Sequence, residues 1–299
     1  MTIIQNYFTL LLTGLAIIYA SAFILLRLLQ NRLIFKPKSV VLVTPATFNL
    51  PYQEVWLSVP NSNNQKICGW WIPQTQPTAK VVLYLHGNSG NMAAQDKSCN
   101  LDRVAKLYQL GFSVFTIDYR GYGNSQGPFP TEARVYEDAL TAWNYLTQDK
   151  NFSPEDIFIY GHSLGGAIAV NLCLQQPKAA GLIAEGCFTS IKDMAKYKRR
   201  IQIFPLNLVI TQKFDFINKV KSLEMPVFFI HGMDDKIVPA TMSQKLFEAA
   251  PDPKKLLLIP NVGHDDLTEV ESDRYIKALQ EFFDHITNQH CTVTQECIH

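Results

Sequence analysis

This sequence has almost no net charge. Its 27 Lys and Arg residues almost balance its 26 Asp and Glu residues, which leaves a formal net charge of +1 over 299 residues. A chain so nearly neutral gives no indication of a nucleic-acid partner or of a strongly acidic substrate. Internal repeats and low-complexity tracts are absent too.

Cysteine is sparse and carries no motif. The six cysteines form no CxxC pair and no metal-ligand spacing, so we expect no metal site and no organic cofactor. Cys173 and Cys187 lie in apolar runs and are predicted to be buried thiols. Cys291 and Cys297 lie in a polar C-terminal tail, residues 288–299, and could pair only in an oxidising compartment.

No charged side chain occurs in the first 26 residues. The apolar run Tyr7–Leu26 would rise about 30 Å as a helix of about 20 residues, which matches the hydrocarbon core of a bilayer. Basic residues follow at once, at Arg27, Arg32, Lys36 and Lys38. Residues 1–38 are therefore predicted to form a single-pass membrane anchor with a basic flank. The positive-inside rule then places the rest of the chain in the cytoplasm.

Two other interpretations of this segment fit its residues less well than an anchor does. A cleaved signal peptide should begin with a positive region, which is missing here, although Ala20-Ser21-Ala22 resembles a cleavage site. A buried core helix would rarely be apolar on every side over such a length. A spanning anchor is the better interpretation.

After Pro37 the chain changes to short apolar runs that alternate with helical patterns. Val55–Val59 and Ile67–Ile72 flank a polar turn, which is typical of a hairpin. The other expected strands are Lys80–Leu85, Ser113–Tyr119, Ile157–Tyr160, Gly181–Ala184, Val227–Ile230 and Leu256–Ile259. The expected helices are Asp102–Leu110, Thr131–Thr147, Leu164–Gln175, Thr241–Ala249 and Glu271–Thr287. Residues 39–287 are therefore predicted to form an α/β domain, a mostly parallel sheet with an antiparallel edge and helices on both faces.

A G-x-S-x-G sequence follows one of these strands. Ile157–Tyr160 runs into Gly161-His162-Ser163-Leu164-Gly165, and a helical stretch comes next. A turn this tight leaves no room for a side chain at either glycine, and it forces the serine hydroxyl outward. The start of the helix adds the positive end of its dipole, which favours a developing anion. Ser163 is the predicted nucleophile.

A serine hydroxyl needs a positioned base, which in this arrangement comes later in the chain. Five histidines follow Ser163. His264 comes straight after the last expected strand, in a loop that can reach the nucleophile, and is the predicted base. His231 leaves its strand directly and is expected to satisfy main-chain groups at the sheet edge. His285 falls in a helix, and the remaining two lie in the tail.

The acid that orients the base should lie between nucleophile and base. Asp234 and Asp235 both follow Val227–Ile230, and two adjacent residues on a turn cannot both point into the site. Asp118 precedes the serine and is expected to cap or pair within its own loop. Asp265 and Asp266, beside the base, are expected to order their loop or face solvent.

Two main-chain N–H groups are expected to form an oxyanion hole. One belongs to Leu164, the residue after the nucleophile. The other belongs to Asn88, in the loop after Lys80–Leu85, where Gly87 allows close approach of the backbone. The side chain of Asn88 is expected to do no more than form a turn.

Taken together, these segments resemble the α/β-hydrolase superfamily, and within it the single-pass membrane-anchored hydrolases. The resemblance runs roughly from Val55 to Phe283. It is carried by the stretches Tyr84–Asn91, Asp118–Ser125, Gly161–Gly166, Phe188–Ser190, His231–Pro239 and Gly263–Leu267. It implies that the acid falls four residues after the strand-end histidine, which is Asp235. It leaves the substrate open among esters, lipids, thioesters and peptides.

Residues 187–224 are the expected cap over the site. Basic residues open it, at Lys196, Lys198, Arg199 and Arg200, and an apolar stretch from Ile201 to Ile210 follows. In one interpretation the apolar side chains pack on the core, as in an ordinary cap. In the other they join the basic cluster in facing an anionic leaflet, which would present the site to lipid-borne acyl groups.

The function expected from these features is a serine hydrolase. It would cleave an acyl ester or thioester through an acyl-enzyme, without a cofactor. A serine peptidase or amidase acting on small peptides is the alternative within the same chemistry. A membrane-tethered binding protein with a vestigial site is the alternative from another class.

Overall fold

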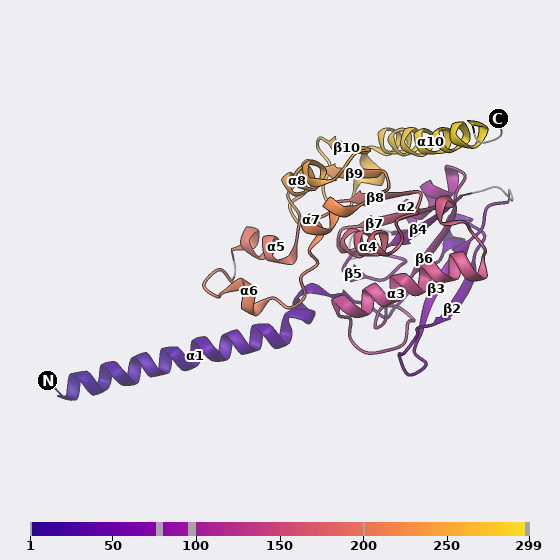
Figure 1. Cartoon of the computed structure of the whole chain (residues 1–299). Coiled ribbons are helices and arrows are strands. Elements are labelled where there is room, and N and C mark those ends of the chain that lie inside the picture. Colours follow the sequence, from indigo (N-terminus) through magenta and orange to yellow (C-terminus); the bar gives the residue numbers. More distant parts are fainter. Residues whose placement is uncertain (1, 76–79, 95–99, 200, 297–299) are drawn as a thin grey trace.

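The computed structural model describes residues 2–75, 80–94, 100–199 and 201–296, and centres on an eight-stranded sheet (Figure 1). The strands are β2 (Gln53–Ser58), β3 (Lys66–Ile72), β4 (Val81–Leu85), β6 (Ser113–Ile117), β7 (Ile157–His162), β8 (Gly181–Glu185), β9 (Val227–Gly232) and β10 (Lys254–Ile259). Their order is β10-β9-β8-β7-β4-β6-β3-β2. Only the pairs β2–β3 and β3–β6 of this sheet are antiparallel. The predicted mostly parallel sheet with an antiparallel edge is confirmed.

Each face of the sheet has its own apolar cluster. In β4, Leu83 and Leu85 belong to one cluster and Val82 and Tyr84 to the other, as a strand without alternation predicts. The helices are α2 (Asn100–Gln109), α3 (Glu132–Asn144), α4 (Leu164–Gln175), α8 (Thr241–Ala249) and α10 (Ser272–Glu296). Side chains of α3, α4 and α8 join the first cluster, and those of α2 and α10 join the second. Helices therefore cover both faces, as expected.

The C-terminal helix differs from the expectation. The helix α10 runs on to Glu296, so most of the stretch expected as a polar tail is helical. No proline or glycine follows Thr287 to end it. Cys173 and Cys187 are buried free thiols, as predicted. Cys297, which could pair with Cys291 only in an oxidising compartment, lies outside the described residues.

The N-terminal helix α1 (Thr2–Ile34) projects away from the domain and is long and apolar enough to cross a membrane (Figure 1). It ends without a linker. Phe35, the next residue, is 1% exposed and belongs to the core. Strand β1 (Lys36–Pro37) then pairs in parallel with β5 (Ser89–Gly90), in the loop after β4. Arg27 and Arg32 of the expected basic flank lie in α1, whereas Lys36 and Lys38 are built into the α/β domain.

The segment between β8 and β9 is the one expected to form a cap. It contains α5 (Ile191–Lys198), α6 (Leu206–Val209) and α7 (Phe216–Lys219). Its apolar residues divide between two environments: Phe204, Val209 and Ile210 are buried, whereas Ile203 is 77% and Leu208 is 60% exposed. Core packing alone therefore does not account for the apolar stretch. Arg200, of the expected basic cluster, lies outside the described residues.

Candidate active site

Ser163 sits in the turn between β7 and α4 with φ 54° and ψ −117°, a conformation that a residue with a side chain adopts only under strain. A Cβ at Gly161 would collide with the carbonyl of Gly165, and a Cβ at Gly165 with the carbonyl of Leu85. The expected tight turn is present, and these glycines make it possible. The N–H of Ser163 donates to the carbonyl of Glu185 at 2.8 Å, which fixes the turn against β8.

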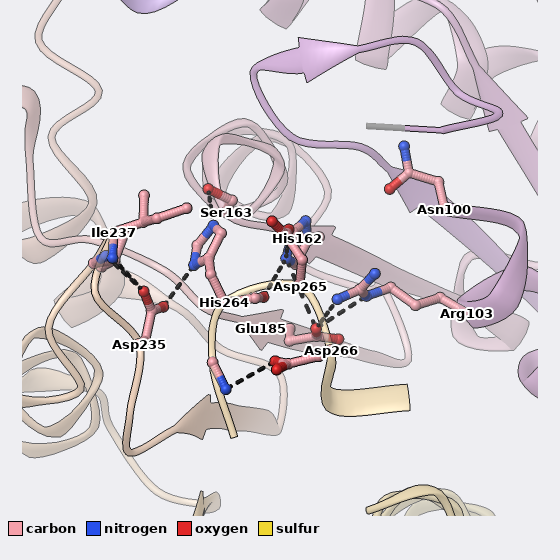
Figure 2. Close-up of polar contacts among 12 residues, drawn as sticks. Asn100, Arg103, His162, Ser163, Glu185, Asp235, Ile237, His264, Asp265 and Asp266 are labelled. Atoms are coloured by element: carbon pink, nitrogen blue, oxygen red, sulfur yellow. Dashed lines mark hydrogen bonds and ion pairs between the residues drawn. The ribbon is translucent and has the colours of Figure 1, made fainter. Parts of the chain in front are cut away.

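His264 connects Ser163 to an aspartate (Figure 2). Its Nε2 lies 3.0 Å from Ser163 Oγ, and its Nδ1 lies 2.5 Å from Asp235 Oδ2. Asp234 is exposed on the same turn, and its N–H donates to Val262. The fold thus resolves the choice between the two aspartates, because only the carboxylate of Asp235 reaches the histidine.

Asp235 accepts several hydrogen bonds. Its Oδ1 accepts the N–H groups of Ile237 at 2.7 Å and Val238 at 2.8 Å, and its Oδ2 faces Nε2 of His231 at 3.1 Å. Burial alone would raise the pKa of Asp235, but hydrogen bonds from His231 and His264 and the charge of His264 hold it well below its usual range. Asp235 therefore stays a carboxylate, oriented to receive Nδ1–H of His264.

His231 does more than the sequence suggested. As expected, it reaches a main-chain group, the carbonyl of Val238, at 3.0 Å. The same nitrogen also faces Asp235, and Nδ1 accepts the hydroxyl of Ser243 at 2.6 Å. The ring is fully buried. Its support of the acid was missed, although the four-residue spacing from His231 to Asp235 around a turn was a signal for it.

A buried ion pair lies behind the nucleophile turn (Figure 2). Arg103, from α2, donates Nε and Nη2 to Glu185 Oε1 at 2.9 and 2.6 Å, and both side chains are almost fully buried. Tyr160 donates to the other oxygen of Glu185. His162, beside Ser163, lies 3.3 Å from the carbonyl of His264, and burial followed by the charge of Arg103 lowers the pKa of His162 well below its usual value. No sequence motif predicted this network.

The two expected oxyanion donors lie at the carboxyl ends of adjacent strands, β4 and β7. Leu164 is the first residue of α4. Asn88 is tied to the chain that leaves α1: its Nδ2 donates to the carbonyl of Ile34 at 2.7 Å, and its own carbonyl accepts the N–H of Lys36 at 2.9 Å. The side chain is therefore more than a local turn former. Among the described residues, no main-chain carbonyl accepts the N–H of Asn88.

The other aspartates divide between loops. Asp118 is buried and accepts the N–H of Met92 at 2.6 Å. Its carboxylate therefore connects the loops after β4 and β6, whereas the sequence predicted that it would pair within its own loop. Asp266 orders its loop as expected, by accepting the N–H of Gly263 at 2.8 Å. Asp265 turns toward His162, 4.0 Å away.

Among the described residues, one group could hold a metal ion, with donor atoms of His162, His264 and Asp265 all within 4.8 Å of one another. Both ring nitrogens of His264 already serve Ser163 and Asp235. Ligation through His264 would break that chain, so we assign the cluster to the hydrogen-bond network.

An open hollow of about 860 Å³ lies beside His264 and Asp235. Five of its eleven lining residues carry a carboxylate. The charged residues around it are Asp234, Asp235, Lys236, Asp265, Asp266 and Glu269. A positively charged group on a substrate would find complementary charge there.

The chain is similar to two described families and to several individual proteins. Residues 76–219 match the family described as serine aminopeptidase, S33, and residues 195–295 match the family described as PhoPQ-activated pathogenicity-related protein. An uncharacterized protein of Mycobacterium tuberculosis is 34% identical over 254 residues, which cover 85% of this chain and 86% of that one. Protein bem46 of Schizosaccharomyces pombe is 33% identical, over 80% of this chain and 79% of its own.

Two further proteins have names that state an activity. The lysophosphatidylserine lipase ABHD12 of Danio rerio is 33% identical over 68% of this chain, which spans 56% of that relative's length. The solved esterase of Pyrococcus furiosus superposes with a TM-score of 0.69 at 20% identity, covering 84% of this chain and 98% of the esterase. With this fold, this tight turn at Ser163 and relatives above 30% identity over most of the chain, the protein belongs to the α/β-hydrolase superfamily.

Proposed function

We propose that this hydrolase is a serine esterase or thioesterase that cleaves acyl groups from lipid-like substrates. The observation that carries the proposal is the continuous hydrogen-bond chain from Ser163 through His264 to Asp235. The names of a lipase relative and of an esterase of the same fold support ester substrates.

In the first half-reaction the hydroxyl of Ser163 attacks the carbonyl carbon of the ester or thioester, and Nε2 of His264 takes the proton. Asp235 holds the imidazole in place and stabilises its positive charge. The N–H groups of Leu164 and Asn88 bind the oxyanion. Collapse of this intermediate leaves the acyl group on Ser163 and releases an alcohol or thiol, which takes the proton from His264.

In the second half-reaction a water molecule attacks the acyl-enzyme. His264 accepts a proton from this water and returns one to Ser163 Oγ as the carboxylic acid leaves. Each bond is broken and formed by groups of this chain and water alone.

The helix α1 is proposed to anchor the enzyme in a membrane as a single-pass segment. Its uncharged first 26 residues and the basic residues after them support a catalytic domain on the cytoplasmic side. An enzyme held there meets acyl chains of the bilayer before it meets soluble esters.

A fluorophosphonate probe tests the proposal directly, because it reacts only with an activated serine. The full chain should be labelled and Ser163→Ala should not. Ser153→Ala, which replaces an exposed serine before β7, should be labelled like the wild type. Labelling that persists in Ser163→Ala would refute the assignment of the nucleophile. A wild-type chain that takes no label and hydrolyses no ester would instead be the membrane-tethered binding protein.

A peptidase or amidase is the second candidate. The carboxylate-lined hollow beside His264 favours it, because the ammonium group of a peptide would be stabilised there, and the matched family description names an aminopeptidase. Rates on a panel of aminoacyl amides beside acyl esters and thioesters separate the two candidates. Faster cleavage of the amides would replace the esterase proposal.

A further inference from the structure

The cap is fastened to the N-terminal helix, well inside the apolar part of that helix. Tyr19 stacks on Phe204 with 4.8 Å between ring centroids, and its hydroxyl donates to the carbonyl of Ile203 at 3.1 Å. Phe23, one turn further along, lies 6.5 Å from the same ring. These contacts come from the last third of the uncharged run, before the first charged residue, Arg27.

The last turns of α1 hold the rest of the cap loop. Arg27 donates to the carbonyl of Leu208. Gln30, which is buried, accepts the N–H groups of Thr211 at 2.8 Å and Gln212 at 3.1 Å through its Oε1. The loop therefore runs alongside the helix in a fixed register from Tyr19 to Gln30.

This register fixes the depth of the loop relative to a bilayer. A helix rises about 1.5 Å per residue, so Tyr19 lies about 10 Å before Leu26, where the apolar run ends. When Tyr7–Leu26 fills the hydrocarbon core, the partners of Tyr19 lie about 10 Å below the end of the run. Ile203 and Phe204 are then among the acyl chains, about 10 Å inside the hydrocarbon core.

The chemistry of the loop suits that depth. Its tip exposes Ile203 and Leu208, at 77% and 60%, while Phe204 faces α1. Exposed basic residues flank the loop in the chain, at Lys196, Lys198, Arg199 and Lys213, against the carboxylates Asp193 and Asp215. Apolar side chains within a basic collar complement a leaflet that contains anionic lipids.

The segment that carries this loop starts beside the proposed catalytic centre. It begins after β8, whose last residue, Glu185, binds the N–H of Ser163. The chain leaving α1 binds Asn88, one of the two proposed oxyanion donors. In Figure 1, α5, α6 and α1 gather at one side of the sheet.

We propose that the cap loop, residues 201–210, inserts its tip into the leaflet at which α1 leaves the membrane. Substrate acyl esters then reach Ser163 from the lipid phase. The inference rests on α1 spanning the membrane and, for substrate entry, on the proposed hydrolase activity.

Depth-dependent fluorescence quenching tests the insertion without using activity. The full chain, with Cys99, Cys291 and Cys297 replaced by serine, is placed in vesicles of phosphatidylcholine and phosphatidylglycerol; Cys68, Cys173 and Cys187 are buried and stay. One polarity-sensitive thiol probe is attached at Ile203→Cys, Leu208→Cys, Ile17→Cys or Val270→Cys. Ile17 is the control inside α1, and Val270, 54% exposed, is the control outside the cap.

Phosphatidylcholine brominated on its acyl chains should quench the probe at positions 203 and 208, as at 17, and leave position 270 unaffected. Quenching at 17 without quenching at 203 and 208 would overturn the insertion and leave the anchor standing. No quenching at 17 would overturn both. If quenching follows the expected pattern but no ester is cleaved, only the hydrolase proposal fails.

The double variant Ile203→Asp, Leu208→Asp tests entry from lipid. Aspartate is strongly disfavoured at acyl-chain depth, so the rate on a vesicle-borne acyl ester should fall about tenfold or more, equivalent to about 1.4 kcal/mol. The rate on a short soluble ester should stay at the wild-type level, and Val270→Asp should change neither. Equal losses on both esters would overturn entry from the lipid phase.

Discussion

Replacing His231 tests whether the acid of the proposed triad depends on a second histidine. Nε2 of His231 lies 3.1 Å from Asp235 Oδ2 and 3.0 Å from the carbonyl of Val238, while Nδ1 accepts the hydroxyl of Ser243. In His231→Phe the ring keeps most of its bulk, but both nitrogens are lost. Asp235 then keeps His264 and two main-chain N–H groups as partners.

The size of the effect follows from the bond that is lost. A hydrogen bond to a charged group contributes about 1.5–3 kcal/mol. If all of this were expressed in the transition state, kcat would fall roughly 10- to 150-fold, at about 1.4 kcal/mol per factor of ten. Because three other donors still hold Asp235, we expect the lower end, about tenfold.

The assay is kcat and KM on a chromogenic acyl ester across a range of pH. Losing the donor concentrates the negative charge of Asp235 on His264, so the half-maximal rate on the acidic side should move to higher pH, with KM little changed. Ser243→Ala is the matched control: it removes the bond at the other nitrogen of His231, and it should lower the melting temperature without moving the pH profile. A His231→Phe enzyme with the wild-type kcat and pH profile would refute the reasoning.

Three further changes test other parts of the fold. Gly165→Ala should abolish fluorophosphonate labelling and lower the melting temperature, because its Cβ would meet the carbonyl of Leu85; normal labelling would contradict the described turn. Arg103→Met leaves Glu185 buried without its positively charged partner and should lower the free energy of unfolding in urea by about 3–5 kcal/mol. Adding Glu185→Leu should recover part of this loss, and additive losses would argue against a coupled pair. Asp235→Asn removes a carboxylate whose pKa in the folded protein lies below the usual value of about 4. The carboxylate therefore stabilises the fold above that pH, and this stabilisation is lost as the pH falls below it. The difference in melting temperature between variant and wild type should shrink in acid, and a constant difference would contradict this.

The sequence predicted the frame of the molecule because its signals are local. Buried parallel strands appear as short apolar runs, and turn residues mark their ends, so the predicted bounds of α4 and α8 agree with the structure. The choice between Asp234 and Asp235 needed the fold, or a resemblance, because both follow β9 and differ only in which way the turn directs them.

What the sequence did not reveal depends on contacts between distant residues. Arg103 and Glu185 are separated by 82 positions, and each is unremarkable in its own helix or strand. Asp118 was expected to bond within its loop, but the fold places the N–H of Met92 closer to it. The bonds between Asn88 and the chain leaving α1 are of the same kind, since a turn-forming residue gives no sign of a partner 54 positions away.

The junction between α1 and the domain has a consequence for how the enzyme searches. Phe35 enters the core directly after the helix, and β1 pairs with β5 in the next residues, so no flexible tether separates helix and catalytic domain. A domain on a long linker would tumble and present its active site in every direction. Here its orientation follows the axis of α1. With α1 in a membrane, as proposed, the enzyme would search for substrate by lateral diffusion in two dimensions, with its tilt relative to the bilayer already set.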